Sequence, residues 1–209
     1  MISLSNAVVF GWHSAIMGMR NPMNSWAKSD SVFYNDFSCQ IGQNDLDLME
    51  KLIKAGAEHR KFLRMIHVQM DIEAPLYWWK EFETYKIGTV ANSCSTMHKI
   101  HAKEFTVNDF SLEHLLSENT VYFGKTLERL NNARRKFLDT KDKKYWWQMI
   151  QLLPSSYNQL RTVDLNYEVL LNQYFQRKDH KLDEWRIYCE QIKCFPYLDK
   201  FIEVLKNEQ

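Results

Sequence analysis

Glycine, proline and cysteine are all scarce in this sequence, and their scarcity excludes several kinds of site. The chain of 209 residues has six glycines, four prolines and four cysteines. So few glycines form no glycine-rich phosphate loop, which excludes the Walker and Rossmann fingerprints. The cysteines stand at positions 39, 94, 189 and 194 and make no CxxC pair. This spacing favours reduced thiols over a zinc site or a disulfide framework.

Excess charge and long apolar runs are also missing. The formal net charge is +1, whereas proteins that bind nucleic acid or membrane surfaces carry a clear basic excess. No apolar run approaches the ~18 residues that indicate a membrane span. No basic stretch followed by an apolar block marks a secretory signal at the N-terminus. We therefore expect a cytoplasmic protein that binds neither nucleic acid nor a membrane.

Apolar and aromatic residues are plentiful. Hydrophobic residues make up 45% of the chain and aromatic residues 14%, with seven tryptophans. This composition is that of a globular chain long enough to bury a sizeable core, and we expect one domain over residues 1–209. Most of the aromatic side chains are expected in the core. Others are candidates for a surface that meets a partner subunit or a flat ligand.

Histidine is the remaining candidate for metal binding. Of the seven histidines, His98 and His101 are three residues apart, which suits one face of a helix. No carboxylate or third histidine completes a ligand set at a recognisable spacing. We expect no metal site.

Periodicity predicts elements in the first half of the chain. Alternating apolar and polar residues predict a half-buried strand over 66–72. The other expected elements are an opening strand over 2–11, a hairpin around Asn35–Asp36, and a helix that is capped by Asn44 and followed by Gly56.

The run that follows the strand at 66–72 organises the chain. Pro75 suits the first position of a helix, because it lacks an N–H group that a helix start leaves unbonded anyway. This short aromatic helix is expected to end at Gly88. Residues 89–96 are then rich in hydroxyl, amide and thiol groups, which predicts a ligand-binding loop.

Helices dominate the second half. The pattern predicts helices over 118–140 and 142–153, a strand over 157–164, and a helix that Asn166 caps. The tail, 182–206, is expected to form one or two amphipathic helices interrupted at Pro196. Long helices with a few strands and no regular alternation indicate an α+β fold.

The segment from Ala74 to Cys94 resembles the signature of the flavin-dependent thymidylate synthases. That family has Ala-Pro, then Arg-Gln, then Arg-His-Arg and, further along, a serine. Here Ala74-Pro75 is retained, Lys80-Glu81 stands for Arg-Gln, and Thr84-Tyr85-Lys86 stands for Arg-His-Arg. Cys94 is in register with the serine, and His59 falls at a family histidine upstream.

A second segment carries the resemblance further. From Leu153-Pro154 the family pattern continues without a gap to two asparagines and an arginine, which fall on Asn166, Asn172 and Arg177. The resemblance covers roughly residues 44 to 195. It implies the thymidylate-synthase-complementing type of fold, in which helices surround a small antiparallel sheet. It also implies a homotetramer with active sites between subunits.

The resemblance implies FAD as cofactor and dUMP as substrate. It implies a methyltransferase that makes dTMP by reductive methylation, with NADPH as reductant and methylenetetrahydrofolate as carbon donor. The implied cofactor-binding residues are His59, Thr84, Tyr85, Lys86, Asn166 and Asn172. The implied substrate-binding residues are Lys80, Glu81, Cys94, Ser95, Thr96 and Arg177. Arg177 is also the candidate catalytic residue, because the family arginine contacts the pyrimidine ring.

Several positions depart from the family pattern. Lys86 is the one cation left in the Arg-His-Arg motif, and a lysine holds a phosphate as a point charge without the fork geometry of arginine. Thr96 and Ile150 stand where the family has phosphate-binding arginines. The cations available to compensate are His98, Lys99 and Arg161.

Some residues keep two interpretations. Tyr85 is either a ring that stacks on a flavin or a half-buried tyrosine in an aromatic cluster. Cys94 is either a nucleophilic thiolate activated by a nearby cation or a small neutral replacement for serine. Asn166, Asn172 and Arg177 alone are compatible with a helix cap and two surface residues.

Two functions other than thymidylate synthesis stay open. The first is a divergent homologue that binds flavin or a pyrimidine nucleotide. Such a homologue either acts on a different nucleotide or is non-catalytic. The second is a structural protein whose surplus of aromatic residues serves interactions. Yellow colour from bound flavin would distinguish the first from the second.

Overall fold

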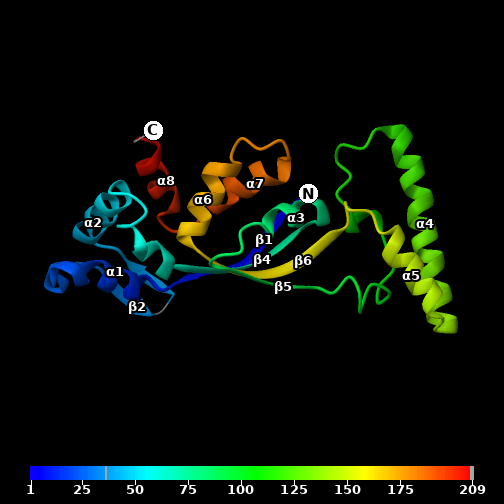
Figure 1. Cartoon of the computed structure of the whole chain (residues 1–209), viewed down its shortest axis with the longest axis horizontal. Helices are drawn as coiled ribbons and strands as arrows, with labels where there is room; N and C mark the ends of the chain where they lie inside the picture. The colour runs from blue at the N-terminus through cyan, green and yellow to red at the C-terminus, as the bar shows by residue number, and fades with distance from the viewer. Residues whose placement is uncertain (36, 208–209) are drawn as a thin grey trace. The chain divides into compact units, whose positions relative to one another are not determined.

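The computed structural model describes residues 1–35 and 37–207 (Figure 1), and it combines long helices with two small sheets. The larger sheet has four strands in the order β1-β4-β6-β5, and the smaller one pairs β2 with β3. The strand bounds are β1 Ser3–Phe10, β2 Val32–Asn35, β3 Ser38–Gln40, β4 His67–Pro75, β5 Thr89–Ser93 and β6 Asn158–Asn166. The helices and the small antiparallel sheet confirm the predicted α+β class.

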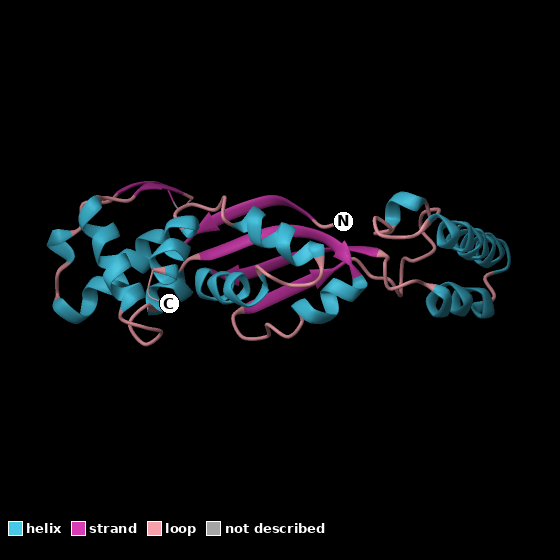
Figure 2. Ribbon diagram, turned by 90° about the horizontal axis from the view of Figure 1, so that it is seen from above, coloured by secondary structure: helices cyan, strands magenta, loops and turns pink. Residues whose placement is uncertain are grey.

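Eight α-helices and four short 3-10 helices are described (Figure 2). The α-helices are α1 Trp12–Arg20, α2 Gln43–Lys54, α3 Leu76–Phe82, α4 Ser117–Thr140, α5 Lys143–Leu152, α6 Tyr167–Arg177, α7 Asp183–Ile192 and α8 Leu198–Lys206. The 3-10 helices are η1 Asn21–Met23, η2 Trp26–Lys28, η3 Lys61–Met65 and η4 Val107–Asp109. In the described part of the chain, no helix is long and apolar enough to cross a membrane.

The inner strands β4 and β6 form where apolar and polar residues alternate. On β4, Val68, Met70 and Ile72 are buried, while Gln69 between them is exposed. A strand sends successive side chains to opposite faces, so one face of β4 meets the core. This confirms the strand predicted over 66–72. The strand predicted over 157–164 is also confirmed, as β6.

The chain divides into two compact units. One comprises Met1–Ser3, Ile72–Thr84 and Asn92–Arg161, and the other Leu4–Asp71, Tyr85–Ala91 and the residues from Thr162 onward. In the first unit α4 and α5 lie side by side (Figure 1) over a cluster that includes Phe110, Leu130 and Met149. In the second, α6 packs against α7, α8 and η3. The expectation of a single domain over 1–209 stays a prediction.

Most helix predictions are confirmed within one or two residues. The helices predicted over 118–140 and 142–153 are α4 and α5, and the tail forms two helices, α7 and α8, on either side of Pro196. The hairpin predicted around Asn35–Asp36 is β2–β3, although Asp36 lies outside the described residues.

Three boundaries were predicted wrongly. The helix after Pro75 ends at Phe82 rather than at Gly88. Residues 89–93 form strand β5 rather than part of a loop. The helix expected to be capped by Asn44 begins at Gln43, with Gly42 at the N-cap.

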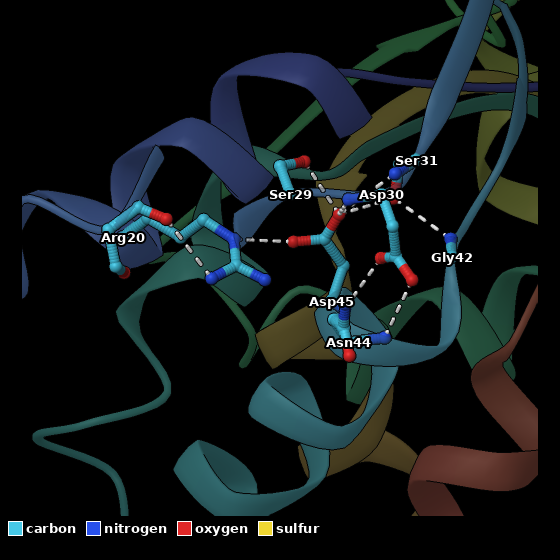
Figure 3. Close-up of polar contacts among 8 residues, drawn as sticks. Arg20, Ser29, Asp30, Ser31, Gly42, Asn44 and Asp45 are labelled. Carbon is cyan, nitrogen blue, oxygen red and sulfur yellow. Dashed lines mark hydrogen bonds and ion pairs between the residues drawn. The ribbon is translucent and has the colours of Figure 1, made fainter. Parts of the chain in front are cut away.

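The correction at α2 has a clear cause (Figure 3). The Asp30 carboxylate accepts hydrogen bonds from the backbone N–H groups of Asn44, at 3.0 Å, and Asp45, at 3.2 Å. A residue distant in sequence therefore supplies the acceptor that a cap side chain normally provides. Gly42 makes this possible, since a Cβ atom there would lie 2.2 Å from the Asp30 side chain.

A buried ion pair lies beside this cap. The Arg20 Nε atom of α1 donates to Asp45 Oδ1 at 2.6 Å, and both residues are buried (Figure 3). The hydroxyl groups of Ser29 and Ser31 donate to Asp45 Oδ2 at 2.7 and 2.6 Å. Burial of Asp45 raises its pKa, but these two hydrogen bonds and the Arg20 guanidinium outweigh burial and lower the pKa overall.

Candidate functional site

The C-terminal end of α6 holds Arg177 between two aromatic rings. Its Nε atom donates to the Tyr85 hydroxyl at 3.0 Å. Its guanidinium carbon lies 4.9 Å from the ring centroid of Trp185 and 5.7 Å from that of Tyr85. A cation above an aromatic face is attracted by the ring's electron density, and a positive charge at a helix C-terminus is also favourable. The side chain of Arg177 is therefore held in one orientation.

Tyr85 is fixed from both sides. Its hydroxyl donates to Gln176 Oε1 at 2.9 Å while it accepts from Arg177. Its half-buried ring meets the fully buried Trp185 edge-on, with centroids 6.1 Å apart. Tyr85 thus belongs to an aromatic cluster, which is one of the two interpretations offered by the sequence. The part of its ring that stays accessible is also compatible with the other interpretation, stacking on a flavin.

The N-terminal end of α6 meets the segment that follows Tyr85. Asn166 caps the helix, because its Oδ1 atom accepts a hydrogen bond from the Val169 N–H at 3.1 Å. Gly88 lies directly against it: a Cβ atom there would lie 2.7 Å from Asn166 Nδ2. Gly88 also has φ +73°, a left-handed conformation that glycine adopts without strain. Only glycine allows this close approach, which leaves Asn166 buried.

The two sequence segments that carry the family resemblance therefore meet. Tyr85 contacts Arg177, 92 residues further along the chain, and Gly88 contacts Asn166 in the other segment. All four residues belong to the second compact unit. Spacing along the sequence alone gave no reason for this contact.

The other predicted residues of this unit are exposed. Asn172 lies on α6 between the buried residues Leu171 and Gln173, and its own side chain faces outward. Lys86 follows Tyr85 and is also exposed. His59 lies in the turn after α2 and lines a different part of the unit, an open cavity of about 670 Å³ formed with residues of α1 and α2 that include Met19 and Leu52.

Six predicted residues belong to the first compact unit. Lys80 and Glu81 lie at the end of α3, where the Thr84 hydroxyl donates to the Glu81 carbonyl oxygen at 2.7 Å. This contact follows the last turn of the helix and leaves Thr84 exposed. The Lys80 side chain is likewise exposed.

Cys94, Ser95 and Thr96 follow β5. The backbone of Cys94 continues the pairing with β6, because its N–H donates to the Leu160 carbonyl at 2.9 Å. Its thiol is exposed. The Ser95 hydroxyl accepts from the His98 N–H at 2.9 Å and lies 3.0 Å from His98 Nδ1. Ser95 and His98 therefore stabilise a turn, and Thr96 is half-buried within it.

Arg161, a cation available to replace the missing arginines, is engaged within the first unit. Its guanidinium lies 4.3 Å from the Trp79 ring centroid and donates to Glu83 Oε1 at 2.7 Å. Its Nε atom donates to Gln159 Oε1 at 3.0 Å. These contacts give Arg161 a structural role in holding α3 to the start of β6.

Sequence reasoning missed Trp185 and Gln176. Trp185 is one of several apolar residues on the buried face of α7, and Gln176 is an exposed residue of α6. Their contacts with Tyr85 and Arg177 are tertiary, so no local pattern indicated them.

The residues near Gly88 and on α6 include groups of the kinds that bind a flavin. Beside Gly88, the Thr89 hydroxyl oxygen is buried without a hydrogen-bond partner among the described residues, and a buried polar atom of this kind is stabilised when a ligand bonds to it. Exposed Asn172 supplies an amide, Tyr85 an aromatic edge, and Lys86 a positive charge. These residue types are ones that can contact a flat, anionic ligand.

Solved structures share the fold. The chain is similar to flavin-dependent thymidylate synthase ThyX from Helicobacter pylori in two crystal structures, each with FAD and dUMP. Both have a TM-score of 0.67 and 15% identity, and they cover 95% and 98% of this chain and 97% and 98% of the other. The chain is also similar to the UMP/dUMP methylase PolB from Streptomyces cacaoi, bound with 5-Br dUMP. That match has a TM-score of 0.58 and 11% identity over 92% of this chain and 88% of the other.

Comparison of the sequence alone with known families and proteins gives no match. No protein-family model matches the sequence, and no curated protein sequence matches it. The structural matches nevertheless extend over nearly the whole chain. The chain has the fold of the flavin-dependent thymidylate synthases, which confirms the fold that the sequence resemblance implied.

Proposed function

We propose that this protein is a flavin-dependent thymidylate synthase-like enzyme that binds FAD and converts dUMP to dTMP. One observation carries the proposal: the segments around Tyr85–Gly88 and Asn166–Arg177, matched separately to the family pattern, lie in contact. FAD and dUMP are bound in the ThyX structures, and PolB is bound to a dUMP analogue. These neighbours support a nucleotide-binding role.

The protein residues act by binding and orientation. Bound FAD would supply the hydride and one-carbon chemistry, with NADPH as reductant and methylenetetrahydrofolate as carbon donor. Arg177, oriented by Tyr85 and Trp185, donates hydrogen bonds to the pyrimidine ring while it remains charged. Asn172 contacts the flavin, and Lys86 holds a phosphate as a point charge.

The assembly and location follow from the same resemblance. We propose a cytoplasmic homotetramer whose active sites lie between subunits. In such an assembly each active site would draw its residues from more than one copy of the chain. Binding of FAD would then depend on assembly.

Flavin content and tritium release test this function. The purified protein is expected to be yellow, with flavin absorbance bands. It should release tritium from the 5-position of labelled dUMP when NADPH and methylenetetrahydrofolate are present. Asn172→Ala should lower flavin content with little change in melting temperature, because the side chain is exposed. A colourless protein that cannot be loaded with FAD would contradict the proposal.

A second candidate is a related enzyme or binding protein with a different nucleotide. Thr96 and Ile150 favour it, since they stand where the family resemblance implies arginines that hold the nucleotide phosphate. PolB, whose name includes both UMP and dUMP, has the same fold at low identity. Parallel titrations with UMP, dUMP and dCMP distinguish the two candidates. Flavin binding without tritium release from any of them would indicate a non-catalytic homologue.

A further inference from the structure

A second cavity, of about 560 Å³, lies in the same compact unit as α6 but is lined by other residues. It is bordered by the end of β1, the first turn of α1, the β2–β3 hairpin and β4. The lining residues that matter here are Phe10, Trp12, His13, Phe33, Cys39 and Gln69. None of the residues assigned above to flavin or dUMP lines it. Its volume is in the range of sites for small organic ligands.

Aromatic rings form the walls of this cavity. The His13 and Phe33 rings meet edge-on with centroids 4.8 Å apart, and the Phe10 and Phe37 rings meet edge-on at 6.3 Å. On its other side, Phe10 stacks on His67 at 5.6 Å with an interplanar angle of 21°. These contacts hold the rings in defined orientations. Fixed aromatic faces and edges suit a flat aromatic ligand.

One polar group at the cavity is also held in place. Gln69 Nε2 donates to Asp164 Oδ2 at 2.8 Å. The other oxygen of that carboxylate, Oδ1, lies 2.9 Å from His67 Nδ1. The Asp164 carboxylate therefore contacts both His67 and Gln69 on β4 and fixes the orientation of the Gln69 amide. An amide fixed in this way offers a carbonyl acceptor and a second N–H donor, the complement of the edge of a nucleobase.

The charge of the cavity limits the ligand further. Among the described residues that line it, there is no lysine, arginine, aspartate or glutamate. The Cys39 thiol is half-buried, and burial raises its pKa, so it stays neutral at neutral pH. The described wall therefore has no lysine or arginine to hold a phosphate. The ligand that fits is neutral.

We propose that this cavity binds a neutral nucleoside, whose base stacks against the Phe33 and Phe10 rings and hydrogen-bonds to the Gln69 amide. The site is separate from the FAD and dUMP site proposed above and does not depend on it. This cavity is expected to bind nucleosides that lack a phosphate, whereas the proposed site at Lys86 and Arg177 binds a nucleotide through its phosphate.

Binding of uridine and adenosine to the full-length protein tests this proposal. Calorimetric titration and saturation-transfer NMR should detect both nucleosides, and Arg177→Ala should leave the affinity for adenosine, which has no pyrimidine base, unchanged. Uridine and adenosine 5′-monophosphates should bind this cavity no more tightly than the nucleosides do, as measured in Arg177→Ala, which weakens the other site. Phe33→Leu keeps an apolar side chain but removes the ring, and it should weaken nucleoside binding roughly five- to hundredfold.

Two further variants make the test specific. Gln69→Leu, at an exposed position, should weaken binding about tenfold without unfolding the protein. Tyr122→Leu removes an exposed aromatic ring on α4 and should change nothing. Failure of both nucleosides to bind the wild type would overturn the proposal. So would unchanged affinity in Phe33→Leu and Gln69→Leu, or loss of adenosine binding in Arg177→Ala.

Discussion

Asp45 makes the stability of the second unit depend on pH in the acid range. Its pKa in the folded protein is lowered below the usual value, so the folded state favours the carboxylate. The stabilisation is fully present above the unfolded-state pKa of about 3.9 and is lost as the pH falls through the lowered folded pKa. The Arg20 guanidinium would then be left buried beside a neutral acid.

Substitution of Asp45 should destabilise the protein strongly. Asp45→Asn leaves the Arg20 charge buried without its partner, and we expect the free energy of unfolding to fall by about 3–5 kcal/mol. Urea denaturation at neutral pH measures this loss. The matched control is Asp47→Asn, an exposed aspartate on the same helix, which should change stability by less than about 0.5 kcal/mol. Equal effects of the two variants would show that the ion pair is not stabilising.

Arg177 is the residue on which nucleotide recognition should depend most. A hydrogen bond from a charged donor contributes about 1.5–3 kcal/mol, so Arg177→Ala should weaken dUMP binding roughly ten- to hundredfold. Arg177→Lys should bind dUMP more tightly than Arg177→Ala but more weakly than the wild type, because lysine lacks the planar fork of the guanidinium group. Calorimetric titration of dUMP gives these affinities.

A second arginine serves as the control for Arg177. Arg186 on α7 is exposed and paired with Asp183. Arg186→Ala should leave dUMP affinity as in the wild type. If Arg177→Ala also binds dUMP normally, Arg177 has only the structural role that its contacts with Tyr85 and Trp185 already give it.

At the scale of elements, the start of α6 has two roles that can be separated. Asn166→Ala should cost about 1 kcal/mol of stability, because the helix loses its cap, and should also lower flavin content. Asn166→Asp keeps the capping oxygen but replaces the amide that can donate to a ligand. It should retain stability and still lose flavin. Urea denaturation and flavin absorbance measure the two effects, and normal flavin content in Asn166→Asp would leave Asn166 as a cap alone.

Elements with strong local signals were predictable from the sequence. Alternation predicted β4, helical periodicity predicted α4 and α5, and the Asn166 cap predicted the start of α6 within a residue. The errors arose where tertiary contacts decide. β5 forms because it pairs with β6, and Asp30 caps α2 from a distance.

The candidate site shows the same division. Asn166, Tyr85 and Arg177 were singled out as candidates because they are in register with the family pattern. Trp185 was not found, because its contact with Arg177 depends on how α7 packs against α6. The burial of Asn166 by Gly88 was equally invisible, since it depends on the backbone conformation of one glycine.

At the scale of the whole molecule, the surface beside the candidate site carries exposed apolar residues, and we expect the subunit interface there. Ile87 is 92% exposed and Val90 is 68% exposed, and both lie in the short segment that also holds Tyr85, Lys86 and Gly88. Large exposed apolar side chains gathered in one place are typical of surfaces that meet another protein. A second copy of the chain is the partner expected from the family resemblance, which implies active sites between subunits.

Assembly and flavin binding should therefore be lost together. We expect sedimentation velocity to show four copies of the 25.1 kDa chain at micromolar concentration. Ile87→Glu adds a charge to the expected interface, where it would be desolvated without a partner, and should shift the protein toward monomer and lower its flavin content. Lys54→Glu, at an exposed position on α2, is the charge-change control and should alter neither. A stable wild-type monomer that still binds flavin would contradict an interface site, because every residue that holds the cofactor would then have to come from one copy of the chain.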